Sequence, residues 1–307
     1  MIDITLLGTS ALMPLPERAL CSAYLSCGGR GILFDCGEGT QTAARRAGQS
    51  LMKTSLIALT HFHGDHYFGL PGLLQSMNAL DRKEPLYITA PGDMERELAP
   101  ILRLTGAMKY DIILLPMPEE GIALNEIDGG FPKGARLLGF KTAHRVESRG
   151  YAFILPRAGK FLPERARALN IPQKLWGRLQ GGETIEYDGI SYSPDMVLGE
   201  PRRGLKVVFS GDTAPCEELS EAARDADLFI CEATFGEDEQ EARAAEYGHM
   251  TFSQAARTAA QAGVKRLWLS HYSPMIKNPE DYIGNARAVF PETCCGYDGM
   301  GIKLNFE

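Results

Sequence analysis

Residues 60–66 of the chain read Thr-His-Phe-His-Gly-Asp-His and come directly after the apolar run Leu-Ile-Ala-Leu at 56–59. A short apolar run of this kind is typical of a buried strand. In an extended segment, side chains two residues apart point to the same side. His61 and His63 can therefore present their imidazoles to one point.

The second half of this stretch can supply ligands to a second position. Gly64 permits a sharp bend, after which Asp65 and His66 can lie across from the first pair. Imidazole nitrogens and carboxylate oxygens with no thiolate nearby suit a borderline divalent ion such as zinc, with manganese or iron as alternatives. The same histidines could instead belong to a solvated loop or be hydrogen-bonded residues of the core. Three histidines spaced around an aspartate favour a metal site over these alternatives.

The composition is that of an ordinary globular protein. The chain has 307 residues, of which 44% are hydrophobic and 23% charged, so it can bury a large core as one domain or two. The first seven residues lack the basic region of a signal peptide, and no apolar run approaches the length that spans a bilayer. We expect a cytoplasmic protein with no membrane segment.

Net charge and cysteine content argue against two classes of protein, those that coat nucleic acid and those held together by disulfides. The formal net charge of −7 argues against a chain that coats nucleic acid through overall positive charge, so a polyanionic substrate would need a local basic patch. The seven cysteines form no C-x-x-C pair and no regular spacing. We expect them to be small buried hydrophobic residues in a reducing compartment.

The rest of the chain alternates between short apolar strands and amphipathic helices, which indicates an α/β protein with mixed sheets. Strands are predicted at 4–7, 23–25, 31–34, 56–59, 86–89, 112–115, 137–142, 151–155, 207–209, 228–231 and 266–269, and helices at 40–47, 69–80, 93–104, 217–224, 252–262 and 279–289. No linker rich in glycine, serine or proline separates two halves. We therefore expect a single domain over residues 1–307.

One segment, residues 156–200, interrupts this alternation with prolines and a Gly-Gly pair. Its first part holds a single acid, Glu164, against six basic residues: Arg157, Lys160, Arg165, Arg167, Lys174 and Arg178. Charge alone favours anion binding and an ordinary solvated helical hairpin about equally.

Further metal-ligand candidates follow other predicted strands. His144, Asp212 and His271 each come just after a strand end, where an α/β scaffold commonly presents polar side chains. Together with the histidine motif they complete two coordination spheres that share Asp212 as a bridge. The predicted ligands are His61, His63, His144 and Asp212 for one ion, and Asp65, His66, Asp212 and His271 for the other.

The His-x-His-x-Asp-His pattern resembles that of the metallo-β-lactamase superfamily. Within it, the chain resembles the ribonuclease Z family, endonucleases that trim the 3′ end of precursor tRNA. The resemblance covers nearly the full length and includes residues 6–9, 34–38, 69–74, 209–213, 232–235 and 248–251. It implies an αβ/βα sandwich of two mixed sheets flanked by helices, a protruding tRNA-gripping arm at 156–200, and a homodimer.

The resemblance also implies a mechanism, in which a water activated between two zinc ions attacks the phosphodiester. Asp65 would accept the proton of this water. His249, which has no metal role, would protonate the departing 3′ oxygen while Glu232 holds its other ring nitrogen. The residues expected to contact RNA are Thr251, Arg18, Arg157, Lys160, Arg165, Arg167, Lys174 and Arg178.

The sequence departs from the family pattern in the loop at 14–19, in the arm at 172–176 and after His271 at 273–276. An alternative function is therefore a phosphodiesterase for cyclic nucleotides or other small phosphodiesters. A non-catalytic scaffold that keeps its metals for folding energy is a third possibility. It ranks last because the ligand set and His249 are all present.

Overall fold

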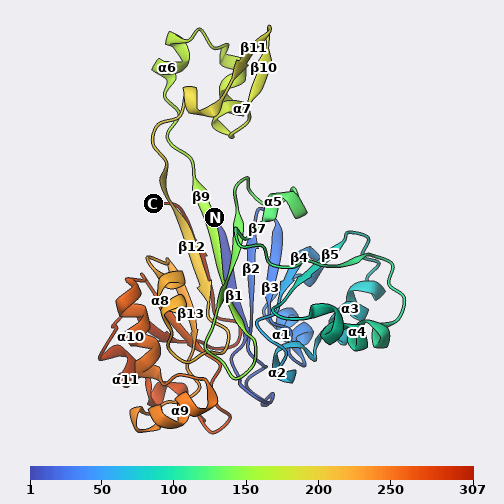
Figure 1. Ribbon diagram of the computed structural model, residues 1–307, viewed down its shortest axis with the longest axis vertical. Coiled ribbons are helices and arrows are strands. Elements are labelled where there is room, and N and C mark those ends of the chain that lie inside the picture. Colours follow the sequence, from blue (N-terminus) through green and yellow to red (C-terminus); the bar gives the residue numbers. More distant parts are fainter.

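Two mixed seven-stranded sheets pack face to face in the computed structural model, which describes residues 1–307 (Figure 1). Helices cover the outer face of each sheet. This is the αβ/βα sandwich expected from the resemblance to the metallo-β-lactamase superfamily. None of the helices is long and apolar enough to cross a membrane.

The first sheet is antiparallel on one side and parallel on the other. Its strands, in spatial order, are β16 (Gly301–Leu304), β1 (Ile2–Gly8), β2 (Ser22–Cys27), β3 (Arg30–Phe34), β4 (Thr54–Ala58), β5 (Leu86–Thr89) and β6 (Ile112–Leu114). From β3 to β6 the neighbours pair in parallel, and the others pair antiparallel. The parallel strands therefore end at one edge of the sheet.

The segments that connect these strands include α1 (Thr40–Arg46), η1 (Leu51–Lys53), α2 (Gly64–Tyr67), α3 (Leu70–Ala79) and α4 (Met94–Thr105). Helix α3 shows why they pack on the sheet. Its apolar side chains recur at helical spacing, and Leu70, Leu73, Leu74 and Met77 are all buried.

The second sheet follows the same plan. Its strands, in spatial order, are β15 (Thr293–Cys295), β14 (Leu267–Ser270), β13 (Leu228–Glu232), β12 (Arg202–Phe209), β9 (Arg149–Arg157), β8 (Arg136–Lys141) and β7 (Ile122–Ala123). Strands β12 to β15 are parallel and the others antiparallel. The helical elements of this half are α5 (Leu124–Ile127), α8 (Glu217–Ala223), η4 (Asp238–Gln240), α9 (Glu241–Tyr247), α10 (Phe252–Ala262), η5 (Pro279–Asp281) and α11 (Ile283–Arg287).

Side chains of both sheets fill the space between them. Along β1, Ile2, Ile4 and Leu6 alternate toward this core, and Phe34 of the first sheet stacks on Phe209 of the second with ring centroids 5.4 Å apart. Replacing one buried phenylalanine of this layer by alanine costs about 3–5 kcal/mol. The packed core thus fixes the strand ends, from which the loops of the candidate site arise.

The segment between β9 and β12 forms an arm that stands away from the sandwich on a two-stranded stalk (Figure 1). It contains α6 (Pro163–Ala168), η2 (Gln173–Leu175), α7 (Trp176–Gln180), β10 (Ile185–Tyr187), β11 (Ile190–Tyr192) and η3 (Pro194–Met196). The arm has a small core of its own, made of Ala166, Ile171, Leu175, Leu179, Ile185, Tyr192 and Val197. The interruption seen in the sequence at 156–200 corresponds to this arm.

The structure also corrects some expectations. The helix predicted at 279–289 is divided into η5 and α11, and Tyr282 lies between them. Cys294 is exposed rather than buried; it lies on β15, an edge strand of its sheet, which has no neighbouring strand on one side. Five of the other cysteines are buried as expected, and none forms a disulfide.

Candidate metal centre and active site

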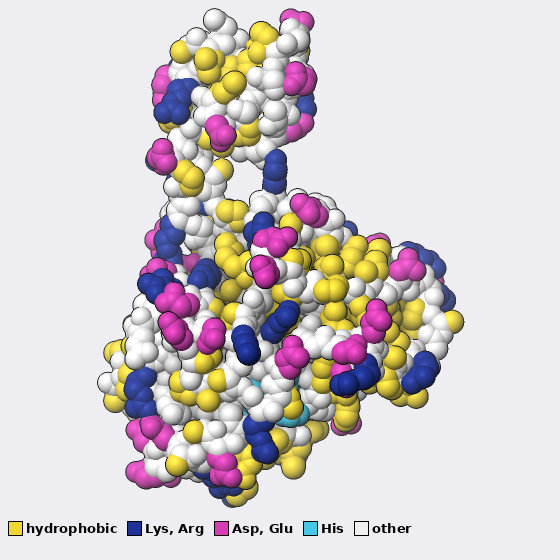
Figure 2. Space-filling model, in the orientation of Figure 1, with side chains coloured by type: hydrophobic (Ala, Val, Ile, Leu, Met, Phe, Trp, Pro, Cys, Tyr) yellow, Lys and Arg dark blue, Asp and Glu magenta, His cyan; other side chains and the backbone are white.

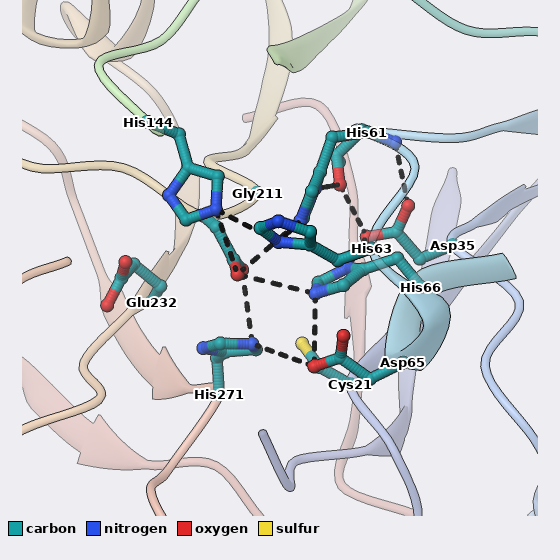
Figure 3. Close-up of polar contacts among 12 residues, drawn as sticks. Cys21, Asp35, His61, His63, Asp65, His66, His144, Gly211, Glu232 and His271 are labelled. Atoms are coloured by element: carbon teal, nitrogen blue, oxygen red, sulfur yellow. Dashed lines mark hydrogen bonds and ion pairs between the residues drawn. The ribbon is translucent and has the colours of Figure 1, made fainter. Parts of the chain in front are cut away.

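The predicted ligands meet at one edge of the sandwich, where loops from both sheets converge (Figure 3). The histidine motif follows β4, His144 follows β8, Asp212 follows β12 and His271 follows β14. His63 has extended backbone angles, and α2 begins at the next residue. The bend expected at Gly64 is therefore the start of a helical turn, which brings Asp65 and His66 back toward the cluster.

The first group of ligands is tightly gathered. The Nδ1 atom of His63 lies 2.9 Å from His61 Nε2 and 3.2 Å from His144 Nε2. The Oδ2 atom of Asp212 lies 3.7 Å from His61 Nε2 and 4.0 Å from His144 Nε2. Three imidazoles and one carboxylate thus surround a single point.

The second group shares the Asp212 carboxylate with the first. His271 Nε2 lies 3.2 Å from Asp212 Oδ1 and 3.8 Å from Asp65 Oδ2. His66 Nε2 lies 3.4 Å from Asp212 Oδ2 and 3.6 Å from Asp65 Oδ2. The Asp212 carboxylate therefore lies within 4.0 Å of ligand atoms of both groups.

Unpartnered polar atoms show that this arrangement fits metal ions. His66 Nε2, His271 Nε2 and Asp212 Oδ1 are all buried and lack a hydrogen-bond partner. Leaving such atoms without a partner costs about 1–3 kcal/mol each. Cations among them would satisfy all three, and the nitrogen and oxygen donors suit a borderline divalent metal.

The protonation states of His61 and Asp212 also suit metal binding. Burial, reinforced by neighbouring imidazoles, holds the pKa of His61 well below its usual value. Burial alone raises the pKa of Asp212, but the surrounding imidazoles outweigh this effect and hold the pKa well below its usual range. A neutral imidazole and an ionised carboxylate are the forms that bind a cation.

Outer hydrogen bonds orient the ligating rings. Asp35 is fully buried, and its Oδ2 lies 2.8 Å from His66 Nδ1 while its carboxylate also accepts from the backbone N–H and hydroxyl of Thr60. Thr234 Oγ1 lies 3.0 Å from His271 Nδ1, and Gly248 O lies 2.9 Å from His144 Nδ1. Each contact engages Nδ1 and leaves Nε2 to face the cluster.

His249 lies at the edge of this cluster and is held by Glu232. The Nδ1 atom of His249 is 2.7 Å from Glu232 Oε1, and the two rings of His249 and His271 stack with centroids 5.5 Å apart. Burial lowers the pKa of His249, but the charge of Glu232 and its hydrogen bond outweigh this and raise the pKa to about 9. A ring held in this way is protonated at neutral pH and can donate a proton.

Glu232 itself is firmly fixed. Its buried carboxylate accepts hydrogen bonds from the backbone N–H groups of Thr213, Thr234 and Met250 and from the Thr234 hydroxyl. These contacts hold Glu232 ready to orient His249. Ligand atoms of His249, Asp212 and His271 also lie within 4.8 Å of one another, so His249 is close enough to share an ion with the other two.

Comparison with known proteins identifies the family. The Metallo-beta-lactamase superfamily matches residues 18–160, and the Beta-lactamase superfamily domain matches residues 195–272. A protein named ribonuclease Z from Agathobacter rectalis is 41% identical, and one from Lachnoclostridium phytofermentans is 40% identical; each alignment covers 100% of this chain and 99% of the relative. The chain belongs to the ribonuclease Z family.

Solved structures agree with the ribonuclease Z assignment. The crystal structure of the short form of human tRNase Z is 25% identical, with a TM-score of 0.68 and coverage of 99% of this chain and 100% of that one. A diphosphatase from the PhnP family is 17% identical with a TM-score of 0.67, and it covers 99% of this chain and 98% of that one. This second likeness shows the fold alone.

Two residues expected to contact RNA, by resemblance to the ribonuclease Z family, have structural roles here. Thr251 is fully buried, and its side chain accepts a hydrogen bond from the Gln254 N–H to cap α10, so it has no surface for RNA. Arg18 is half-buried; its Nη2 donates to Ile276 O and its guanidinium lies over the Tyr272 ring. It ties the loop at 14–19 to the segment after His271.

The basic residues of the arm region lie far from the metal cluster (Figure 1). The arm surface in Figure 2 carries both signs of charge, because residues 158–201 contain five basic and six acidic residues. Arg178 pairs with Glu183, and Arg157 contacts the backbone oxygen of Glu307. The basic excess predicted from 157–178 is therefore local and partly neutralised.

Sequence reasoning gave no role to Asp35 or Thr234. Asp35 has a positive φ of 57° at the end of β3, a conformation that costs little for aspartate but is unusual for most residues. The signal that could have pointed to it is an aspartate directly after an apolar strand and two residues before Gly37. Its contact with His66 depends on pairing between β3 and β4, which the sequence does not display.

Proposed function

We propose that this protein is a zinc-dependent endoribonuclease that removes the 3′ trailer of precursor tRNA. The observation that carries the proposal is two adjacent ligand groups with the Asp212 carboxylate close to both, and with buried unpartnered donor atoms, beside the His249–Glu232 pair. The family relatives named ribonuclease Z and the tRNase Z neighbour support the RNA substrate.

Two zinc ions fit the two groups. His61, His63, His144 and Asp212 would hold one, and Asp65, His66, Asp212 and His271 the other. When bound, such a pair of ions lowers the pKa of water and offsets the negative charge that builds on the phosphate oxygens. The remaining steps belong to side chains of the protein.

Asp65 serves as the proton acceptor for the attacking water. Burial alone raises the pKa of Asp65, but hydrogen bonding and charge from His271 and His66 outweigh it and hold the pKa far below its usual range. The side chain is therefore ionised. The Leu12 N–H donates to Asp65 Oδ2 at 2.8 Å, which fixes the carboxylate and leaves Oδ1 for the water proton.

His249 serves as the general acid. As the water oxygen bonds to phosphorus, the bond from phosphorus to the 3′ oxygen breaks, and the Nε2 proton of His249 passes to that oxygen. Glu232 keeps the ring charged before transfer and oriented during it. The products are a tRNA that ends in a 3′ hydroxyl and a trailer that begins with a 5′ phosphate.

The arm serves as a separate tRNA-binding element. Its own apolar core and its two-stranded stalk hold it away from the metal cluster, a distance that suits contact with the body of a tRNA (Figure 1). We further propose that the protein works as a homodimer, in which one subunit's arm reaches over the other's site. The five buried, unpaired cysteines support a cytoplasmic location.

The test is cleavage of a 5′-labelled precursor tRNA, with a nitrophenyl phosphodiester assayed in parallel. We expect a single endonucleolytic cut at the 3′ side, a product with a free 3′ hydroxyl, and loss of activity after chelation of the metal. Hydrolysis of the small ester without cleavage of the tRNA would reject the RNA substrate and favour the small-phosphodiester alternative.

A further inference from the structure

Two arginines next to the candidate active site have no acidic partner. Arg145 directly follows His144, and Arg243 lies on α9, six residues before His249. Both are exposed, and neither forms an ion pair or a donor hydrogen bond in the structure. The nearby acid Glu241 is already paired with Arg257. Two free positive charges thus remain beside the proposed general acid.

Aromatic rings hold these guanidinium groups in place. Arg145 lies over the exposed ring of Tyr247 at 5.5 Å, and Arg243 lies over the same ring at 6.0 Å and over Phe235 at 5.9 Å. Cation–π contacts of this kind orient a guanidinium while leaving its N–H donors free. Tyr247 therefore brings two sets of free donors together, and we name Arg145, Arg243 and Tyr247 the arginine clamp.

Two members of the arginine clamp, Arg243 and Tyr247, lie on α9 in the same segment as His249, and the third, Arg145, directly follows His144. The centroid of the His249 ring lies 6.5 Å from that of Phe235 and 5.1 Å from that of His144. Gly248 links the clamp to the cluster: with a φ of +73°, it packs against His144, and a Cβ there would lie 3.0 Å from His144 Nδ1 and 3.3 Å from Arg145 N. Figure 2 shows basic side chains next to the exposed histidine surface.

The chemistry of this surface points to a phosphate. Two guanidiniums can offer several N–H donors to one anion in a planar, bidentate fashion, which suits a phosphodiester better than a lone carboxylate. The clamp is exposed and next to the reacting phosphate, so a neighbouring phosphate of the same RNA strand can reach it.

The position of His249 indicates which of the two phosphates next to the scissile phosphate lies near the arginine clamp. Because His249 protonates the departing 3′ oxygen, the nucleotide that carries this oxygen lies on the His249 side of the reacting phosphorus. The next phosphate on that side is the one 5′ of this nucleotide. The trailer, in contrast, continues from the phosphorus in the other direction.

We propose that the arginine clamp binds the backbone phosphate one nucleotide 5′ of the scissile phosphate, on the mature side of the cut. This inference rests on the proposed function. It assigns the clamp a role in substrate binding and in fixing the strand direction, with no part in the chemical step.

The test uses precursor tRNAs that carry one neutral methylphosphonate linkage, placed either one nucleotide 5′ or one nucleotide 3′ of the scissile phosphate. For the wild type we expect the 5′ replacement to lower kcat/KM about tenfold, the order of one lost phosphate contact, and the 3′ replacement to have a smaller effect. The Arg145→Gln/Arg243→Gln variant should show a similar loss on the unmodified RNA and no further loss from the 5′ replacement.

Matched variants separate binding from folding. Arg224→Gln/Arg266→Gln removes the same charge near the opposite ends of the strands and should behave as the wild type. Tyr247→Ala releases the guanidiniums without removing charge and should give an intermediate loss. The magnitude of the slope of log kcat/KM against log salt should fall by about one for the double clamp variant.

Several results would overturn the inference. A clamp variant that keeps the wild-type sensitivity to the 5′ replacement would show that another group binds this phosphate. If the clamp variant instead loses its sensitivity to the 3′ replacement, the clamp binds the phosphate on the trailer side, and the RNA strand runs in the opposite direction from the one proposed. Equal losses on the tRNA and on a nitrophenyl phosphodiester would indicate a purely structural effect. If the wild type cleaves no precursor tRNA, the proposed function fails and the inference fails with it.

Discussion

The Glu232→Gln substitution tests how the protein keeps its general acid charged. Glu232 raises the pKa of His249 to about 9 against the lowering effect of burial. Without the Glu232 charge, burial and nearby imidazoles remain, so the pKa falls below the ordinary value of about 6.5. Because a general acid must be protonated to act, the alkaline limb of the activity profile should move to lower pH by about 2.5 units or more.

The size of the effect depends on pH. At pH 8, a group with a pKa of about 9 is roughly 90% protonated, whereas one with a pKa of about 6.5 is roughly 3% protonated, a loss of about 30-fold. At pH 6 the same change costs less than about twofold. The assay is kcat for precursor tRNA between pH 5.5 and 9.5 with saturating metal.

A control separates this effect from damage to the loop. Glutamine keeps the shape of Glu232 but places an amide group where the carboxylate accepts from backbone N–H groups, so some general loss is expected. Thr213→Val disturbs a neighbouring hydroxyl contact without removing charge. It should lower activity by one factor at every pH. If Glu232→Gln also lowers activity equally at pH 6 and pH 8, Glu232 does not set the pKa of His249.

Three other substitutions have defined outcomes. His249→Ala should lower turnover at least about 100-fold while both metals stay bound, as measured by elemental analysis; loss of an ion would make His249 a ligand. Asp35→Asn, which tolerates the positive φ, should weaken metal affinity about 10–100-fold by removing the acceptor for His66 Nδ1; unchanged affinity in a chelator titration would contradict that role. Replacing residues 158–201 by a short turn should raise KM for precursor tRNA and spare hydrolysis of a nitrophenyl phosphodiester, because the arm core is separate; equal loss on both substrates would argue against a tRNA-binding arm.

Much of the sandwich could be predicted because its strands and helices have clear local signals. Helix α10 matches its predicted bounds, since its apolar positions repeat at helical spacing and Thr251 caps it. Strand β16 was missed: its four residues are short, mostly exposed and follow glycines, and they become a strand only by pairing with β1 across almost the whole chain. Such pairings have no local signature.

In the candidate site, too, some residues could be predicted from local sequence and others could not. Histidines and aspartates at strand ends indicated the cluster, since metal ligands are limited to few residue types. The roles of Asp35 and of the arginine clamp depend on which loops meet in three dimensions. Thr251 was expected to contact RNA because it lies in a motif of the ribonuclease Z family, but its side chain is buried and caps α10.

The most direct test of the account is anomalous diffraction from crystals of the metal-loaded protein, recorded on both sides of the zinc absorption edge. We predict two peaks about 3.5–4 Å apart on either side of the Asp212 carboxylate, with His249 outside both coordination spheres. A single peak, or a second peak bound by His249 in place of Asp65 or His66, would contradict the two-ion site proposed for this chain.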